Sequence, residues 1–235
     1  MLFRRHSPAV SRVLTAAAAM IAALGVANCT SLTARNGSLG GTLNGASFSG
    51  LALSDVLLEA NGTYITRLLL DRDSTIERWP DRREEPLRVW IDSSANVPGM
   101  LGIFPSAVRS AFAEWEETGI PIRVVYVRKY GDADIRVRWI DHLERKTGST
   151  TWRTDHDGWL TTSEITLATH VSNGEQLDAR GMKAIALHEV GHALGLSHSI
   201  DAHDIMAPLV RVDDLSGPDR STIKLLYTLP AGHVR

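Results

Sequence analysis

Residues 188–198 read His188-Glu-Val-Gly-His192-Ala-Leu-Gly195-Leu-Ser-His198, and this stretch decides both the fold and the chemistry to be expected. Positions four apart lie on one face of a helix, so His188 and His192 are predicted to point at one ion. Gly195 favours a helix end followed by a sharp turn, which brings back His198 as a third ligand. Three protein ligands leave one position of a tetrahedral zinc open, as in catalytic rather than structural sites.

The acidic residue inside this stretch is the candidate catalytic group. Glu189 directly follows the first histidine, which places its carboxylate beside the metal. A carboxylate at that position can act as general base on a water bound to the zinc.

The pattern of residues 188–198 resembles the signature of the metzincin zinc metallopeptidases. The segment Asp204–Pro208 that follows looks like the Met-turn of that clan, in which a methionine, here Met206, packs beneath the metal site. A thioether suits this position because it is apolar and flexible and competes poorly for zinc.

Details beyond the motif resemble one branch of the clan, the matrixins (peptidase M10 type). These details are Ser199, the Met-x-Pro sequence ending at Pro208, and a tail at 215–227 similar to the closing helix of matrixin catalytic domains. The resemblance spans about residues 79–230 and is most specific at 188–208. It implies an α+β, zincin-like fold, in which a twisted mixed sheet packs on two long helices. The catalytic zinc lies in the cleft, and a short C-terminal helix closes the domain.

Local sequence patterns upstream and downstream of the motif predict the elements of this fold. Alternation of apolar residues predicts strands and a 3.6-residue period predicts a helix, whereas Asp178 and the pair Ser216/Asp219 are typical helix N-caps. The expected elements are strands at 87–92, 122–127, 134–140 and around Ile165 and Leu167, a helix at 106–117, and a polar loop at 141–162. Their order is the β-α-β-β-β-α-turn-α implied by the matrixin resemblance.

The resemblance implies a zinc endopeptidase that hydrolyses peptide bonds of proteins, and the N-terminal residues described below predict that it is exported. Three neutral histidines let zinc lower the pKa of its water to about 7, and Glu189 accepts the proton and returns it to the leaving amine. The alternative is a non-catalytic metzincin-fold binding or scaffold module at the cell surface. The intact Glu189 favours the peptidase. In matrixins the substrate pairs with an edge strand, for which Glu164–Thr169 is the candidate, and Leu209–Arg211 would wall the specificity pocket.

The first 29 residues predict an export signal. A basic start is followed by the apolar stretch Val13–Ala27, which is short for a membrane span of about 20 residues. Cleavage after Gly25-Val-Ala27 would give a secreted or periplasmic protein. Alternatively, Val26–Cys29 resembles a bacterial lipobox, which would make the chain a cell-envelope lipoprotein anchored through Cys29. An uncleaved signal anchor is a third outcome.

The chain is therefore expected to have three segments: a signal peptide at 1–29, a flexible or weakly ordered lead-in at 30–78 and the catalytic domain at 79–235. Its 235 residues are 43% hydrophobic, and the formal net charge is −2, which argues against nucleic acid as a partner. The single cysteine excludes an intrachain disulfide. We expect a monomer with protein or peptide substrates, and contact with a membrane only through a lipid anchor at Cys29.

One catalytic zinc is expected, without a structural zinc or a calcium ion. His156, Asp157 and His170 carry ligand atoms, but their spacing does not match that of the matrixin structural sites, so they are interpreted as solvated loop residues. His203 lies between the third histidine and Met206 and is expected to be exposed rather than to act as an alternate ligand.

Overall fold

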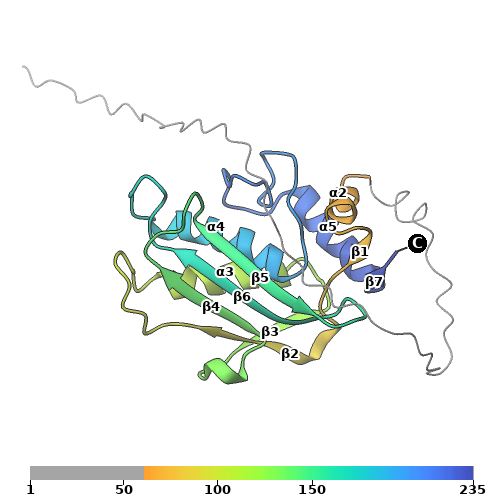
Figure 1. Ribbon diagram of the computed structural model, residues 1–235, viewed down its shortest axis with the longest axis horizontal. Coiled ribbons are helices and arrows are strands. Elements are labelled where there is room, and N and C mark those ends of the chain that lie inside the picture. The colour runs from red at the N-terminus through yellow and green to blue at the C-terminus, as the bar shows by residue number, and fades with distance from the viewer. Residues whose placement is uncertain (1–60, 235) are drawn as a thin grey trace, which may run out of the picture. The chain divides into compact units, whose positions relative to one another are not determined.

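The computed structural model describes residues 61–234, and the expectations for the signal segment and for Cys29 lie outside this range. A five-stranded sheet has the order β3-β2-β4-β6-β5, in which β5 alone runs antiparallel to its neighbour. Helices α3 and α4 pack on each other and on one face of this sheet (Figure 1). This is the α+β architecture expected from the sequence. The elements are α2 (Ile65–Asp71), β1 (Thr75–Ile76), β2 (Arg82–Ile91), α3 (Phe104–Glu116), β3 (Ile122–Tyr126), the 3-10 turn η1 (Tyr130–Asp132), β4 (Ile135–Ile140), β5 (Gly148–Thr154), β6 (Leu160–Ala168), α4 (Ala179–Ala193), α5 (Gly217–Thr228) and β7 (Gly232–His233).

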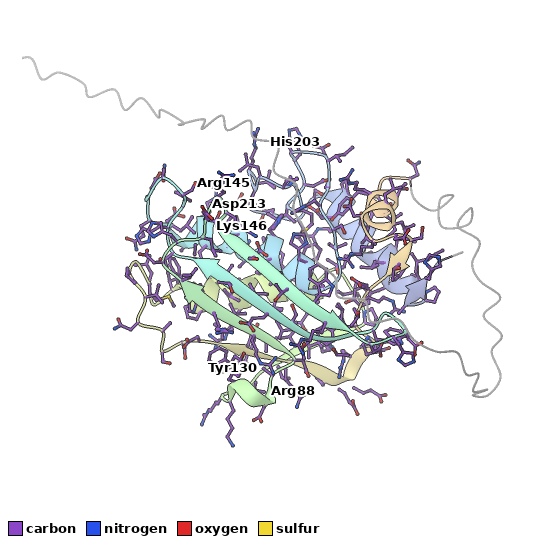
Figure 2. The ribbon with its side chains drawn as sticks, in the orientation of Figure 1. Arg88, Tyr130, Arg145, Lys146, His203 and Asp213 are labelled. Carbon is purple, nitrogen blue, oxygen red and sulfur yellow. The ribbon has the colours of Figure 1, made fainter. Side chains whose placement is uncertain are left out.

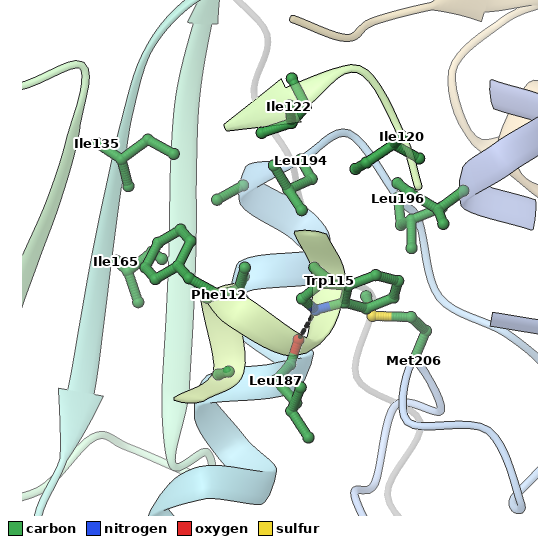
Figure 3. Packing of buried hydrophobic residues seen from close by; sticks show 14 of the residues in the cluster. Phe112, Trp115, Ile120, Ile122, Ile135, Ile165, Leu187, Leu194, Leu196 and Met206 are labelled. Carbon is green, nitrogen blue, oxygen red and sulfur yellow. Dashed lines mark hydrogen bonds between the residues drawn. The ribbon is translucent and has the colours of Figure 1, made fainter. Parts of the chain in front are cut away.

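The core lies between the sheet and the two long helices. Trp115 of α3 is fully buried, and its indole N–H donates to the carbonyl of Leu187 in α4 at 2.9 Å (Figure 3). This bond satisfies the one polar atom of a large apolar side chain and fixes how the two helices pack. The buried side of α4 also carries His188 and His192. The packing of α3 on α4 therefore sets the position of these two predicted metal ligands.

The expected helix caps are confirmed. The Asp178 side chain accepts the backbone N–H of Gly181 at 2.7 Å at the start of α4. Ser216 and Asp219 form a reciprocal capping box at the start of α5. In the described part of the chain, every helix is too short or too polar to cross a membrane.

Strand β5 was not expected, because it falls within the stretch 141–162 that was predicted to be a polar loop. It pairs along its whole length with β6, from Gly148 opposite Leu167 to Thr154 opposite Leu160. Only its first residue is buried, so it shows no alternation of apolar side chains for a sequence pattern to detect. The expectation that residues 164–169 form the edge strand is also wrong, because β6 lies between β4 and β5.

The residues just before 79 differ from the weakly ordered lead-in expected there. Ile65, Leu68 and Leu69 of α2 are buried in the main core, and α2 contacts α5. Strand β1 pairs with β7 near the other end of the chain. The packed domain therefore includes residues from Tyr64 onward, which the sequence pattern did not indicate.

Candidate metal centre

The end of α4 brings the three predicted histidines together. His188 and His192 lie one turn apart, and Gly195 ends the helix with a backbone φ of +108°. A Cβ on Gly195 would lie 2.4 Å from the carbonyl oxygen of Glu77, so the turn that returns His198 needs glycine. The Nε2 atom of His192 is 3.1 Å from that of His188 and 3.2 Å from that of His198.

Backbone carbonyls hold two of these rings through their other nitrogen. Nδ1 of His188 donates to the carbonyl of Ile205, and Nδ1 of His192 donates to that of Leu196, both at 2.8 Å. A carbonyl only accepts, so the proton is on Nδ1 and the lone pair of Nε2 faces the other histidines. A hydrogen bond from the ring nitrogen that does not face the metal orients a metal-binding histidine and fixes its tautomer.

The surroundings keep the three imidazoles neutral. Burial lowers the pKa of His188 to about 4, and burial also lowers the pKa values of His192 and His198. A neutral ring is the form that binds a metal. The group of three can therefore hold an ion at neutral pH.

The carboxyl group of Glu189 is enclosed between α4 and β5. The hydroxyl of Thr150 donates to its Oε2 at 2.6 Å, and a Cβ on Gly148 would lie 2.4 Å from its Oε1. Burial raises the pKa of Glu189 to about 7, although the hydrogen bond from Thr150 acts in the opposite direction. A carboxyl of this kind can both accept and release a proton near neutral pH.

Met206 is fully buried in the turn after the third histidine. Its sulfur lies against Gly191 of α4, where a Cβ would be only 2.3 Å from Sδ, and it lies beside Trp115 (Figure 3). The backbone of the turn is held by Asp219, whose Oδ2 accepts the N–H of Ile205 at 2.8 Å. The predicted methionine turn therefore supports the segment whose carbonyl orients His188.

Sequence patterns missed a second support of the site, formed by the Arg72 side chain. Its Nη2 lies 3.3 Å from the same Leu196 carbonyl that accepts from His192. The guanidinium also lies 3.3 Å from Oε2 of Glu77, and it stacks 5.0 Å from the centre of the Trp152 ring. Arg72 precedes the motif by more than a hundred positions, so no local spacing could have linked it to the histidines.

Replacing Arg72 with methionine should weaken zinc binding by about 10-fold, because the Leu196 carbonyl loses one of the two donors that fix it. The affinity is measured by competition with a chromophoric chelator. Arg83→Met is the matched control, since Arg83 is exposed and pairs with Asp81 away from the histidines. Equal affinities of the two variants would show that Arg72 does not support the site.

The remaining histidines considered from the sequence lie elsewhere. His203 is exposed and contacts Asp201, on a loop at the surface (Figure 2). His156 is exposed on the β5–β6 turn, where it pairs with Asp157. His170 does not contact that pair; it lies against Asp141 and His142.

The residues predicted to wall the specificity pocket follow the methionine turn. Leu209 and Arg211 are exposed and Val210 is half-buried.

Comparison with known proteins finds a matching family model and a similar protein. The family model Peptidase M10, described as matrixin, matches residues 103–228, a little more than half of the chain. Matrix metalloproteinase-15 of Homo sapiens is 30% identical over 162 residues, which are 60% of this chain and 24% of that protein. The chain thus matches about a quarter of the length of this relative. The family match contains α3, α4, the three histidines and Met206, and the chain therefore belongs to the matrixin family.

Proposed function

We propose that this chain is an exported zinc-dependent endopeptidase that hydrolyses peptide bonds of proteins. The observation that carries the proposal is the convergence of the Nε2 atoms of His188, His192 and His198 at the end of α4, the helix that also bears the buried carboxyl of Glu189. Membership of the matrixin family supports zinc dependence and a protein substrate. Export is supported by the basic start and the apolar stretch within residues 1–29.

The donor set fits a zinc ion held by His188, His192 and His198. Their rings are neutral, two of them are fixed by carbonyls, and three ligands match the number in catalytic zinc sites. Zinc bound there supplies Lewis-acid chemistry, because it polarises a carbonyl oxygen and lowers the pKa of a water.

Glu189 is the residue that moves protons. It accepts the proton of the attacking water as general base and passes it to the amine nitrogen of the leaving product. The hydroxyl of Thr150 holds Oε2, so the carboxyl keeps one orientation during both transfers. Gly148 supports this role because any larger residue would occupy the space of the carboxyl.

The substrate binds as an extended strand along β5. Among the described strands, β5 pairs only with β6, so its other edge is available to a peptide. Strand addition gives affinity through main-chain hydrogen bonds and makes few demands on sequence. Because β5 also packs against α4, a peptide paired with β5 passes close to the three histidines.

The test is casein cleavage by the purified full chain with and without 1,10-phenanthroline. Cleavage should stop with the chelator and return when zinc is added, since the metal supplies the Lewis acid. A calcium-selective chelator is the control and should leave the rate unchanged. If zinc binds to the three histidines but neither casein nor a broad peptide library is cleaved, the chain is a non-catalytic binding module instead.

A further inference from the structure

A second group of metal-binding side chains lies where β4 and β6 end. The two strands are parallel neighbours, with Ile140 opposite Ala168, so their carboxyl ends meet at one edge of the sheet. Asp141 and His142 follow β4, and His170 follows β6 by two residues. The backbone N–H of His170 donates to the carbonyl of Asp141 at 3.2 Å, which fixes the two ends together.

Three potential ligand atoms converge in this group. Oδ1 of Asp141 lies 2.7 Å from Nδ1 of His170 and 2.9 Å from Nδ1 of His142. All three atoms lie within 4.8 Å of one another. The rings of His142 and His170 are nearly parallel, and their centroids are 4.8 Å apart. Each ring places its Nδ1 atom beside the Asp141 carboxylate.

The Asp141 oxygen in this group lacks a partner of normal geometry. Within residues 61–234, Oδ1 of Asp141 is buried, and neither ring nitrogen is aligned to donate a hydrogen bond to it, although both lie at short distance. A buried carboxylate oxygen without a donor is costly, whereas a cation between the three atoms would satisfy it. This second observation separates the group from an ordinary solvated cluster.

The spacing resembles that of the three histidines on α4. There the Nε2 atoms lie 3.1 and 3.2 Å apart, and ligands at about 2.1 Å from a tetrahedral ion lie about 3.4 Å from one another. In the second group the two distances from Oδ1 of Asp141 to the ring nitrogens, 2.7 and 2.9 Å, need to lengthen by about 0.6 Å to reach this spacing. His142 has room to shift because its side chain is 47% exposed. His170 is held against Gly99, where a Cβ would lie 2.4 Å from its Cε1.

We propose that Asp141, His142 and His170 bind a second divalent transition-metal ion. Two imidazoles and one carboxylate form a donor set for zinc or cobalt rather than for calcium, which prefers oxygen ligands. This proposal departs from the single metal expected from sequence spacing. The competing arrangement is a metal-free polar cluster, in which Nδ1 of His170 donates to Oγ1 of Thr169 at 3.1 Å.

Such an ion would have a structural role near the candidate active site. The loop after His142, which carries Arg145 and Lys146 (Figure 2), leads directly into β5. The first residues of β5 include Gly148 and Thr150, which enclose the carboxyl of Glu189. An ion at the end of β4 would therefore anchor the loop that positions this part of β5.

The experiment counts metal ions in the full chain without a histidine tag and with Glu189→Gln to prevent self-cleavage. Metal-free protein is titrated with Co²⁺, and bound metal is measured by elemental analysis and by the visible absorption of Co²⁺. The parent should bind about two ions per chain. His170→Ala should bind about one ion per chain, and so should His142→Ala, which changes a partly exposed side chain. The circular dichroism spectra of both variants should match that of the parent, which would show that they are folded.

Two further variants separate this site from the first. His156→Ala, which removes an exposed histidine elsewhere, should retain about two ions. His188→Ala should lose the ion at the α4 site and keep the one at Asp141, so failure of either site is seen independently. A parent that binds a single ion, or a folded His142→Ala variant that still binds two, would overturn the proposal.

Discussion

The variant Glu189→Gln should hydrolyse casein about 10³-fold more slowly than the parent while binding the same amount of zinc. Glutamine keeps the shape of the side chain and can still accept the hydrogen bond from Thr150. It cannot take up the proton of the attacking water. The three histidines and their carbonyl partners are untouched by this change, so the metal should remain.

The measurement pairs the cleavage rate with the zinc content of the same sample. Glu85→Gln is the matched control, because Glu85 is exposed on β2 and should leave both values unchanged. A Glu189→Gln protein that keeps more than about a tenth of the parent rate would remove Glu189 from the role of general base. Loss of zinc along with activity would instead show that the carboxyl supports the metal.

Replacing Asp219 with alanine should lower the free energy of unfolding by about 4 kcal/mol. This carboxylate is fully buried. It accepts from the backbone N–H groups of Ile205 and Ser216 at 2.8 and 2.9 Å, and from the hydroxyl of Tyr64 at 3.0 Å. Each donor left unsatisfied in the interior costs about 1–3 kcal/mol, and the capping box of α5 is also lost.

The same change should reduce zinc affinity by about 10-fold or more. Ile205 connects the two effects, because its N–H is held by Asp219 and its carbonyl accepts from His188. Urea unfolding of the metal-free protein gives the stability, and chelator competition gives the affinity. Asp213 (Figure 2) pairs with the exposed Arg180, so Asp213→Ala should unfold at the urea concentration of the parent. Identical midpoints for the two variants would contradict the role of Asp219.

Sequence patterns predicted the candidate site better than the rest of the fold, because most of the site is local. His188, Glu189 and His192 lie within one stretch of helix, where a spacing of four fixes their mutual position. His198 and Met206 follow closely, and a single sharp turn at Gly195 returns His198 toward the helix. The structure brings the three histidines together and buries Met206 against Gly191 of α4.

The missed elements depend on contacts that are distant in sequence. Strand β5 carries polar residues on an edge, and only its pairing with β6 identifies it as a strand. Helix α2 has seven residues, too few to be stable alone, and its apolar side chains are buried through packing near α5. Arg72 and the group of Asp141 with His170 likewise meet their partners only in the folded chain.

The contact of Tyr64 with the last helix limits how far the N-terminus can be trimmed. Its backbone N–H donates to Thr222 and its hydroxyl donates to Asp219, the residue that also holds the methionine turn. A processing protease that cuts before Tyr64 leaves these bonds in place. A cut a few residues later removes a donor to Asp219 and exposes the apolar surface under α2, so the mature N-terminus of an active product should lie at or before Tyr64.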